Sequence, residues 1–115
     1  MNPIDDKTTE LAQLLRESPE YTEFVRCREQ AMADGATKIL LDEYGKLQYR
    51  IQAASIAGTV NDEELQKLQK LGELLQLNRL SSEYLFARYR LNAVLTKIYH
   101  TLAESIDIDL SMLDD

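Results

Sequence analysis

The sequence predicts an all-α protein, an elongated antiparallel bundle of about four to five helices, three of them long, that packs into a homo-oligomer. The 115 residues include only four Gly and two Pro. The chain is rich in Leu, Ala, Glu, Gln, Lys and Arg, the residues that lose least free energy on entering a helix. From about residue 34 to 106, apolar residues recur at steps of three and four, the spacing of one helix face.

Two short helices are predicted before the long ones. The first covers about residues 5–17, where three Leu share one face. Pro19 cannot continue that helix but suits the first position of a new one, with Ser18 as its N-cap. The second helix carries a weaker apolar stripe and is expected to end near Asp34 and Gly35.

The first long helix is predicted over about residues 36–57. Its apolar face is formed by Leu40, Tyr44, Leu47, Ile51 and Ala54. Gly45 lies inside this helix, where it costs about 0.8–1 kcal/mol relative to Ala. It marks either a close helix crossing or a tolerated weak position, and we favour the second interpretation.

A turn at residues 58–61 leads into the next helix. Asn61 with Glu64 three residues later resembles a capping box, with Asn in place of Ser or Thr. The helix carries a seam of Leu and is expected to close near Asn78.

The last helix is predicted over about residues 81–106 and is the longest. At 1.5 Å per residue it reaches about 39 Å, longer than a compact chain of this size, with a radius of gyration near 13 Å, can easily cover. Part of its apolar face should therefore contact another subunit. Tyr84, Leu91 and Ile98 are the predicted interface residues.

The domain organisation follows from these elements. Residues 1–106 are predicted to form a single helical domain, because the chain is too short for two independent cores. Residues 107–115 interleave carboxylates with apolar residues and show no helix cap or sustained period. They are expected to be a disordered acidic tail, with a short peptide that docks on a partner as the alternative.

The charge of the chain limits its partners. Thirteen Lys and Arg against twenty Asp and Glu give a net charge of -7, which repels phosphate backbones and anionic lipids. Direct nucleic-acid binding is disfavoured, and RNA binding through Arg79, Arg88 and Arg90 is kept as an alternative. No apolar run approaches the roughly 18–20 residues that span a bilayer, so a cytoplasmic protein without membrane insertion is expected.

Catalytic and cofactor sites are not predicted. His100 has no second His or Cys with which to form a metal site. Cys27 is the only cysteine, and its neighbours Arg26 and Arg28 are expected to point away from it. The four Gly are scattered and form no phosphate-binding loop. The sequence therefore predicts neither catalytic residues, nor a cofactor, nor a metal, and favours a protein that is not an enzyme.

Several short segments together resemble the YlbF/YmcA family of small bacterial helical proteins. They are residues 15–21 (Leu-Arg-Glu-Ser-Pro-Glu-Tyr), the helix over 40–47, the turn at Gly58, and residues 78–85 with 90–92. The resemblance covers nearly the whole chain. It implies an all-helical fold, frequent homo-oligomers, and regulation of competence, sporulation and biofilm formation with ribonuclease-associated regulatory proteins as partners.

The best-known branches of that family can also hold iron–sulfur clusters through cysteines near the carboxyl end. This chain has no cysteine after Cys27, so the resemblance does not extend to cluster binding. The chain looks more like the short, cysteine-poor YheA-type branch. What the resemblance implies is a regulatory adaptor, accessory to an endoribonuclease, with a self-assembling protein as the alternative.

Overall fold

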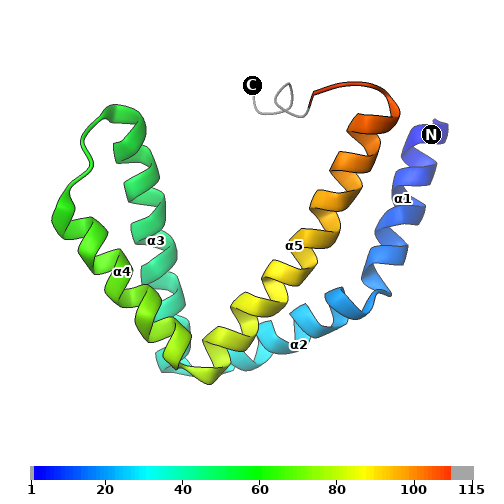
Figure 1. The fold of residues 1–115 in the computed structure, drawn as a ribbon. Coiled ribbons are helices and arrows are strands. Elements are labelled where there is room, and N and C mark those ends of the chain that lie inside the picture. The colour runs from blue at the N-terminus through cyan, green and yellow to red at the C-terminus, as the bar shows by residue number, and fades with distance from the viewer. Residues whose placement is uncertain (1, 110–115) are drawn as a thin grey trace. The chain divides into compact units, whose positions relative to one another are not determined.

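The computed structural model describes residues 2–109, and in that range the chain forms helices joined by short turns, without strands (Figure 1). The all-α class predicted from sequence is confirmed. The helices are α1 (Pro3–Arg16), α2 (Pro19–Ala33), α3 (Gly35–Ala57), α4 (Asp62–Leu77) and α5 (Arg79–Ser105).

The helix ends lie within two residues of the predicted positions because local capping signals fix them. The hydroxyl oxygen of Ser18 accepts the N–H of Tyr21 at 3.2 Å. The side-chain oxygen of Asn61 accepts the N–H of Glu64 at 3.1 Å. Both predicted N-caps are thus confirmed, and each satisfies one of the backbone donors that a helix start leaves unpaired.

Two helices end in a left-handed residue. Gly58 follows α3 with φ of 74°, and the next N–H, of Thr59, reaches the carbonyl of Ala54 at 2.8 Å. Asp107 follows α5 with φ of 57°, and the N–H of Ile108 reaches the carbonyl of Ala103 at 2.9 Å. This is the Schellman arrangement, in which Gly is usual and Asp is tolerated. The first residues of the predicted acidic tail, 107–109, therefore close α5, and residues 110–115 lie outside the described residues.

The helices group into two compact units. One contains the residues up to Val25 together with those from Phe86 onward, and the other contains Arg26–Leu85. Among the described residues of the first unit the buried side chains are the small Ala87 and Ala103, and α1 has no buried residue. The core of this unit is thin.

The second unit is built around the antiparallel pair α3 and α4, which pack against each other. Leu47 of α3 and Leu71 and Leu75 of α4 are its large buried side chains. A Cβ added at Gly72 would lie 3.6 Å from a ring carbon of Tyr44, whereas nothing lies within 4 Å of one added at Gly45. The close approach in this pair is thus at Gly72, and Gly45 fits the tolerated weak position that we favoured.

Candidate interaction surfaces

Four polar residues link the turn before α3 to the turn before α5. A carboxylate oxygen of Asp34 accepts two hydrogen bonds from Thr37, one from its hydroxyl at 2.6 Å and one from its backbone N–H at 3.1 Å. The amide nitrogen of Asn78 donates to the Thr37 hydroxyl at 3.0 Å, and the Asn78 amide oxygen accepts the N–H of Ser81 at 3.3 Å. Thr37 and Ser81 are fully buried. We call these four residues the polar joint. Its hydrogen bonds connect the start of α3 to the turn that follows α4.

The polar joint should make the stability of the chain depend on acid pH. The hydrogen bonds from the Thr37 hydroxyl and then from its N–H lower the pKa of Asp34 below its ordinary value of 3.8. A carboxylate with a depressed native pKa stabilises the fold above its unfolded pKa, and that contribution is lost as pH falls through the native value. We expect Asp34→Asn to lower stability at neutral pH, with the difference from the native chain shrinking towards about pH 3.

Urea denaturation followed by circular dichroism at both pH values measures this difference. Asp42→Asn, at an exposed carboxyl of α3 outside the polar joint, is the matched control. A difference between the native chain and Asp34→Asn that does not change with pH would contradict the assignment.

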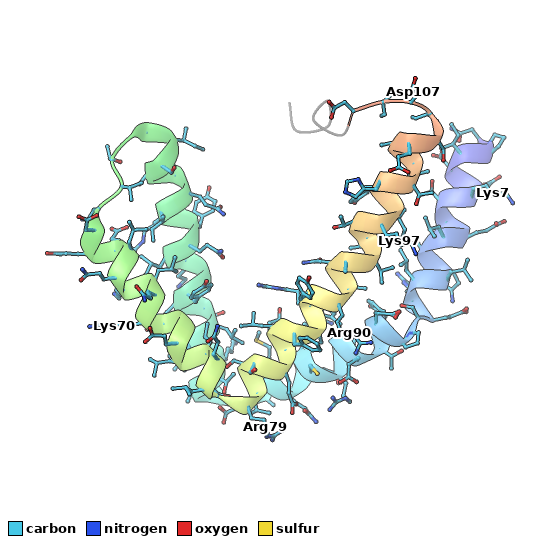
Figure 2. The ribbon with its side chains drawn as sticks, viewed as in Figure 1. Lys7, Lys70, Arg79, Arg90, Lys97 and Asp107 are labelled. Carbon is cyan, nitrogen blue, oxygen red and sulfur yellow. The ribbon has the colours of Figure 1, made fainter. Side chains whose placement is uncertain are left out.

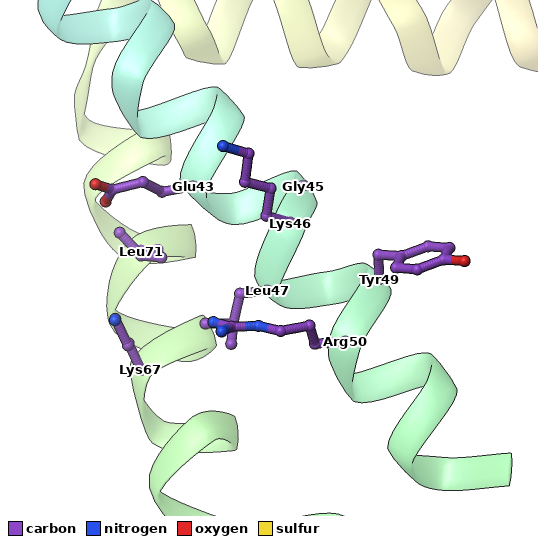
Figure 3. Close-up of a pocket in the computed structure, with 8 residues that line it drawn as sticks. All are labelled: Glu43, Gly45, Lys46, Leu47, Tyr49, Arg50, Lys67 and Leu71. Atoms are coloured by element: carbon purple, nitrogen blue, oxygen red, sulfur yellow. The ribbon is translucent and has the colours of Figure 1, made fainter. Parts of the chain in front are cut away.

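A hollow of about 590 Å³ opens between α3 and α4, within the Arg26–Leu85 unit (Figure 3). Its apolar floor is formed by Leu47 and Leu71, which are 1% and 7% exposed. Figure 3 shows Arg50 reaching from α3 towards α4, where Lys67 lies. The hollow is lined by Glu43, Gly45, Lys46, Leu47, Tyr49, Arg50, Lys67 and Leu71.

Positive charge dominates this hollow. Lys46 and Arg50 stand four residues apart on α3, Lys67 is added by α4, and Glu43 is the carboxylate among the lining residues. None of these four side chains forms an ion pair with another described residue. Three cations against one anion give a local excess of positive charge on a chain whose net charge is -7. We call this site the cationic hollow.

Helix α3 also has an apolar side that no other described element covers. Tyr49 is 74% exposed and Ile56 is 91% exposed. At 100° per residue both lie about 160–180° around the helix from the buried Leu47. A helix that is apolar on opposite sides is typical of one that is covered on both.

The three predicted interface residues lie on one side of α5, as their seven-residue spacing requires. Tyr84, Leu91 and Ile98 are each half-buried. The more exposed apolar side chains of α5 are elsewhere on the helix: Phe86, Tyr89, Tyr99 and Leu102. The assignment of the first three to a subunit interface stays a prediction, since this chain already covers part of each.

The three Arg of the RNA-binding alternative do not gather into one cluster. Arg79 pairs with Glu83 at 3.3 Å on the surface of α5. Arg88 lies about 180° around the helix from Arg79, and Arg90, on nearly the same side as Arg79, lies about 16 Å along the axis. Arg79 and Arg90 are labelled in Figure 2. A continuous phosphate-binding surface would need these charges to be adjacent.

Cys27 is 2% exposed, which shields its thiol from solvent. The guanidinium of Arg26 approaches its sulfur at 3.5 Å, so the expectation that Arg26 points away from Cys27 was wrong. A long Arg side chain can fold back along its own helix. His100 is exposed on α5.

Across residues 2–109 no three His, Cys, Asp or Glu side chains are grouped in a way that could hold a metal ion. Over the same range, no helix combines the length and apolar character needed to cross a membrane.

Comparison with known proteins places the fold in a family. The family described as control of competence regulator ComK, YlbF/YmcA, matches residues 4–107. The chain belongs to the YlbF/YmcA family. The resemblance predicted from short segments is thereby confirmed over nearly the whole chain.

Relatives of this YlbF/YmcA-family chain span almost its full length. A UPF0342 protein of Halothermothrix orenii is 34% identical over 107 residues, covering 92% of this chain and 91% of the relative. The UPF0342 protein STH1710 of Symbiobacterium thermophilum is 30% identical over 106 residues, covering 91% and 95%.

Two solved structures share the fold. A protein of unknown function (DUF964) from Bacillus stearothermophilus superposes with a TM-score of 0.83 at 16% identity, covering 92% of this chain and 94% of that one. Bacillus subtilis RicA, solved in complex with RicF, gives a TM-score of 0.65 at 14% identity, covering 90% and 93%. At these identities the likeness shows the YlbF/YmcA-family fold alone.

Proposed function

We propose that this chain is a non-enzymatic regulatory adaptor that acts by binding proteins, beginning with a second copy of itself. The observation that carries the proposal is the apolar surface that the chain leaves exposed. The large apolar side chains buried in the described residues are Leu47, Leu71 and Leu75, whereas Ile56 and Leu77 are 91% and 84% exposed. Exposed apolar side chains that lie together mark interaction surfaces, and Phe86 and Tyr89 are such neighbours, three residues apart on α5.

The biological setting of the proposal comes from the family. Its description concerns control of a competence regulator, and the related fold of RicA was solved in complex with RicF. We infer a cytoplasmic role in bacterial developmental regulation, covering competence, sporulation and biofilm formation. Ribonuclease-associated regulatory proteins are the further partners that we propose. The net charge of -7 favours protein partners over nucleic acid.

The proposed contact between copies includes Tyr84, Leu91 and Ile98. Each keeps a minor part of its surface exposed on its own chain, and a second copy could bury that part. We expect light scattering at about micromolar concentration to give the mass of an oligomer, because nanomolar to micromolar affinity is usual for a specific protein interface. Ile98→Glu should shift the mass to that of a monomer, since it would bury a charge in the contact.

Thr96→Glu, at an exposed position of the same helix, is the matched control and should leave the mass unchanged. Circular dichroism of each variant checks that the helices persist. A native chain that is monomeric would contradict the proposal. Affinity capture from the native cytoplasm tests the regulatory part: recovery of a ribonuclease or of other family members supports it, and recovery of this chain alone contradicts it.

A further inference from the structure

One exposed side of α5 has the residue spacing of a coiled-coil seam. Its residues follow one another at steps of three, four, three and four, which are the steps between the a and d positions of a heptad. Two helices pack together at these positions. We call these residues the α5 seam, and all of them are exposed: Phe86, Tyr89, Ala93, Thr96 and His100.

The α5 seam presents both large aromatic side chains and a hollow beside them. Phe86 and Tyr89 are 63% and 70% exposed. The small side chains of Ala93 and Thr96 leave a hollow of about 540 Å³ between Tyr89 and His100. In a coiled coil, each apolar side chain of one helix enters a hole between four residues of the facing helix. The hollow can therefore receive an apolar side chain from a helix that lies along the seam. It is lined by Tyr89, Asn92, Ala93, Thr96, Lys97 and His100.

The two flanks of the α5 seam differ in charge. One flank carries Arg90 and Lys97, which occupy the e positions of the heptad and are labelled in Figure 2. The other flank carries Asn92 and Tyr99, which occupy the g positions and are neutral. Residues 86–103 contain no Asp or Glu, although the net charge of the chain is -7. This side of α5 is therefore locally cationic.

The distribution of charge argues against a second copy of this chain on the α5 seam. In an antiparallel pair of helices e positions face e positions, so Arg90 and Lys97 would meet the same cations of the other copy. In a parallel pair e positions face g positions, so these cations would meet the neutral Asn92 and Tyr99. Neither arrangement places a carboxylate beside the cations. The seam therefore suits a partner with a different sequence.

We propose that the α5 seam binds an amphipathic helix of another protein, one that carries Asp or Glu on the flank facing Arg90 and Lys97. The proposal rests on the adaptor function and adds the chemistry of the partner. Amphipathic helices commonly bind proteins through an apolar face with residues three and four apart. Opposite charges at e and g positions then determine which partner is accepted. From Phe86 to His100 the seam is about 21 Å long at 1.5 Å per residue, and for so short a contact we expect micromolar affinity.

A designed helical peptide tests the proposal on the full chain. The probe is a fluorescent peptide of three heptads with Leu at the a and d positions and Glu at the e and g positions. The reference peptide has Lys in place of every Glu. In fluorescence anisotropy at neutral pH we expect the Glu peptide to bind with a Kd of about 1–100 µM, more weakly as salt is added. The Lys peptide should bind at least about tenfold more weakly. Since the net charge of -7 favours the Lys peptide elsewhere on the chain, preference for the Glu peptide indicates binding at a cationic surface.

Two charge-reversal pairs separate the α5 seam from general electrostatics. Arg90→Glu with Lys97→Glu should weaken binding of the Glu peptide by about tenfold or more. Lys38→Glu with Lys70→Glu changes the net charge equally, at exposed positions of α3 and α4, and should change binding little. Circular dichroism of each variant checks that the helices persist.

A matched pair of Tyr variants tests the apolar part of the contact. Tyr89→Ala should weaken binding of the Glu peptide by about tenfold, because exposed aromatic side chains commonly carry much of the affinity of an interface. Tyr49, on α3, is 74% exposed and lies outside the α5 seam. Tyr49→Ala should leave binding of the Glu peptide unchanged.

The α5 seam and the proposed contact between copies can be tested separately, because they lie on different sides of the helix. Ile98 lies about 160° around α5 from Thr96. Ile98→Glu should change the mass in light scattering and leave binding of the Glu peptide intact. Thr96→Glu should leave the mass intact and weaken binding by about tenfold or more, because its carboxylate repels the peptide. Peptide binding by a monomeric native chain would contradict the contact between copies alone.

Several outcomes would overturn the proposal for the α5 seam and leave the adaptor function standing. They are no binding of the Glu peptide up to about 1 mM, equal binding of the two peptides, and equal weakening by the two charge-reversal pairs. Equal binding by Tyr89→Ala and the native chain would also overturn it. A short RNA that binds through Arg90 and Lys97, while the Glu peptide does not bind, would make this side of α5 a phosphate-binding surface instead.

Discussion

Replacing Leu75 with Ala is expected to lower the free energy of unfolding by about 3 kcal/mol. The side chain is 1% exposed in α4, within the Arg26–Leu85 unit. Truncation to Ala removes buried methyl and methylene groups, so their favourable transfer free energy is lost. It also leaves a cavity that the surrounding helices fill only in part. Domains of this size are typically stable by about 5–15 kcal/mol, so the loss is a large fraction of the total. Urea denaturation followed by circular dichroism measures it.

The neighbouring residue provides the matched control. Leu74 belongs to the same helix and has the same side chain, but it is 49% exposed. Leu74→Ala makes the same change in side chain and in helix propensity. It should lower the free energy of unfolding by about 1 kcal/mol or less. Similar losses for the two variants would mean that the burial pattern of α4 differs from the one described.

The helices could be predicted from the sequence because their signals are local. Ser18 with Pro19 and Asn61 with Glu64 each place a capping side chain within three residues of the backbone that it caps. The left-handed turn that closes α5 was harder to recognise than the position of the helix end. Its left-handed residue is Asp107, whereas the residues that usually indicate such a turn are Gly and, less often, Asn.

The cationic hollow could not be predicted, because it depends on the register of two helices. Lys46 and Arg50 are visible as neighbours on one helix face from their spacing of four residues. Nothing in the sequence says that Lys67, on the next helix, comes to the same side of the pair. Helix periodicity determines the direction in which a side chain leaves the axis of its own helix. It does not determine how far one helix is shifted along its neighbour.

The interface on α5 shows the same limit. Helix length and periodicity correctly placed Tyr84, Leu91 and Ile98 on one side of one long helix. They could not indicate how much of that side the rest of the chain would cover, and all three are half-buried. Phe86 and Tyr89, which were not among the predicted interface residues, are 63% and 70% exposed.

Asn78→Ala is expected to lower the free energy of unfolding by about 2–3 kcal/mol, because one side chain makes two kinds of contact. Its amide oxygen caps α5 by accepting the N–H groups of Leu80 at 2.9 Å and Ser81 at 3.3 Å. Loss of such a cap costs about 1 kcal/mol. Its amide nitrogen donates to the buried Thr37 hydroxyl at 3.0 Å, joining residues 41 positions apart. Removing a partner from a buried polar group costs about 1–3 kcal/mol.

Two further variants separate these contributions. Asn78→Ser keeps a capping oxygen but is too short to reach Thr37, so it should lose only the second contribution. Thr37→Val removes the hydroxyl, and in that background Asn78→Ala should cost about 1 kcal/mol less than in the native chain. Urea denaturation of the four members of this cycle gives the coupling directly. Strict additivity would show that the hydrogen bond between α3 and the α4–α5 turn adds nothing to stability, and that Asn78 acts only as the cap of α5.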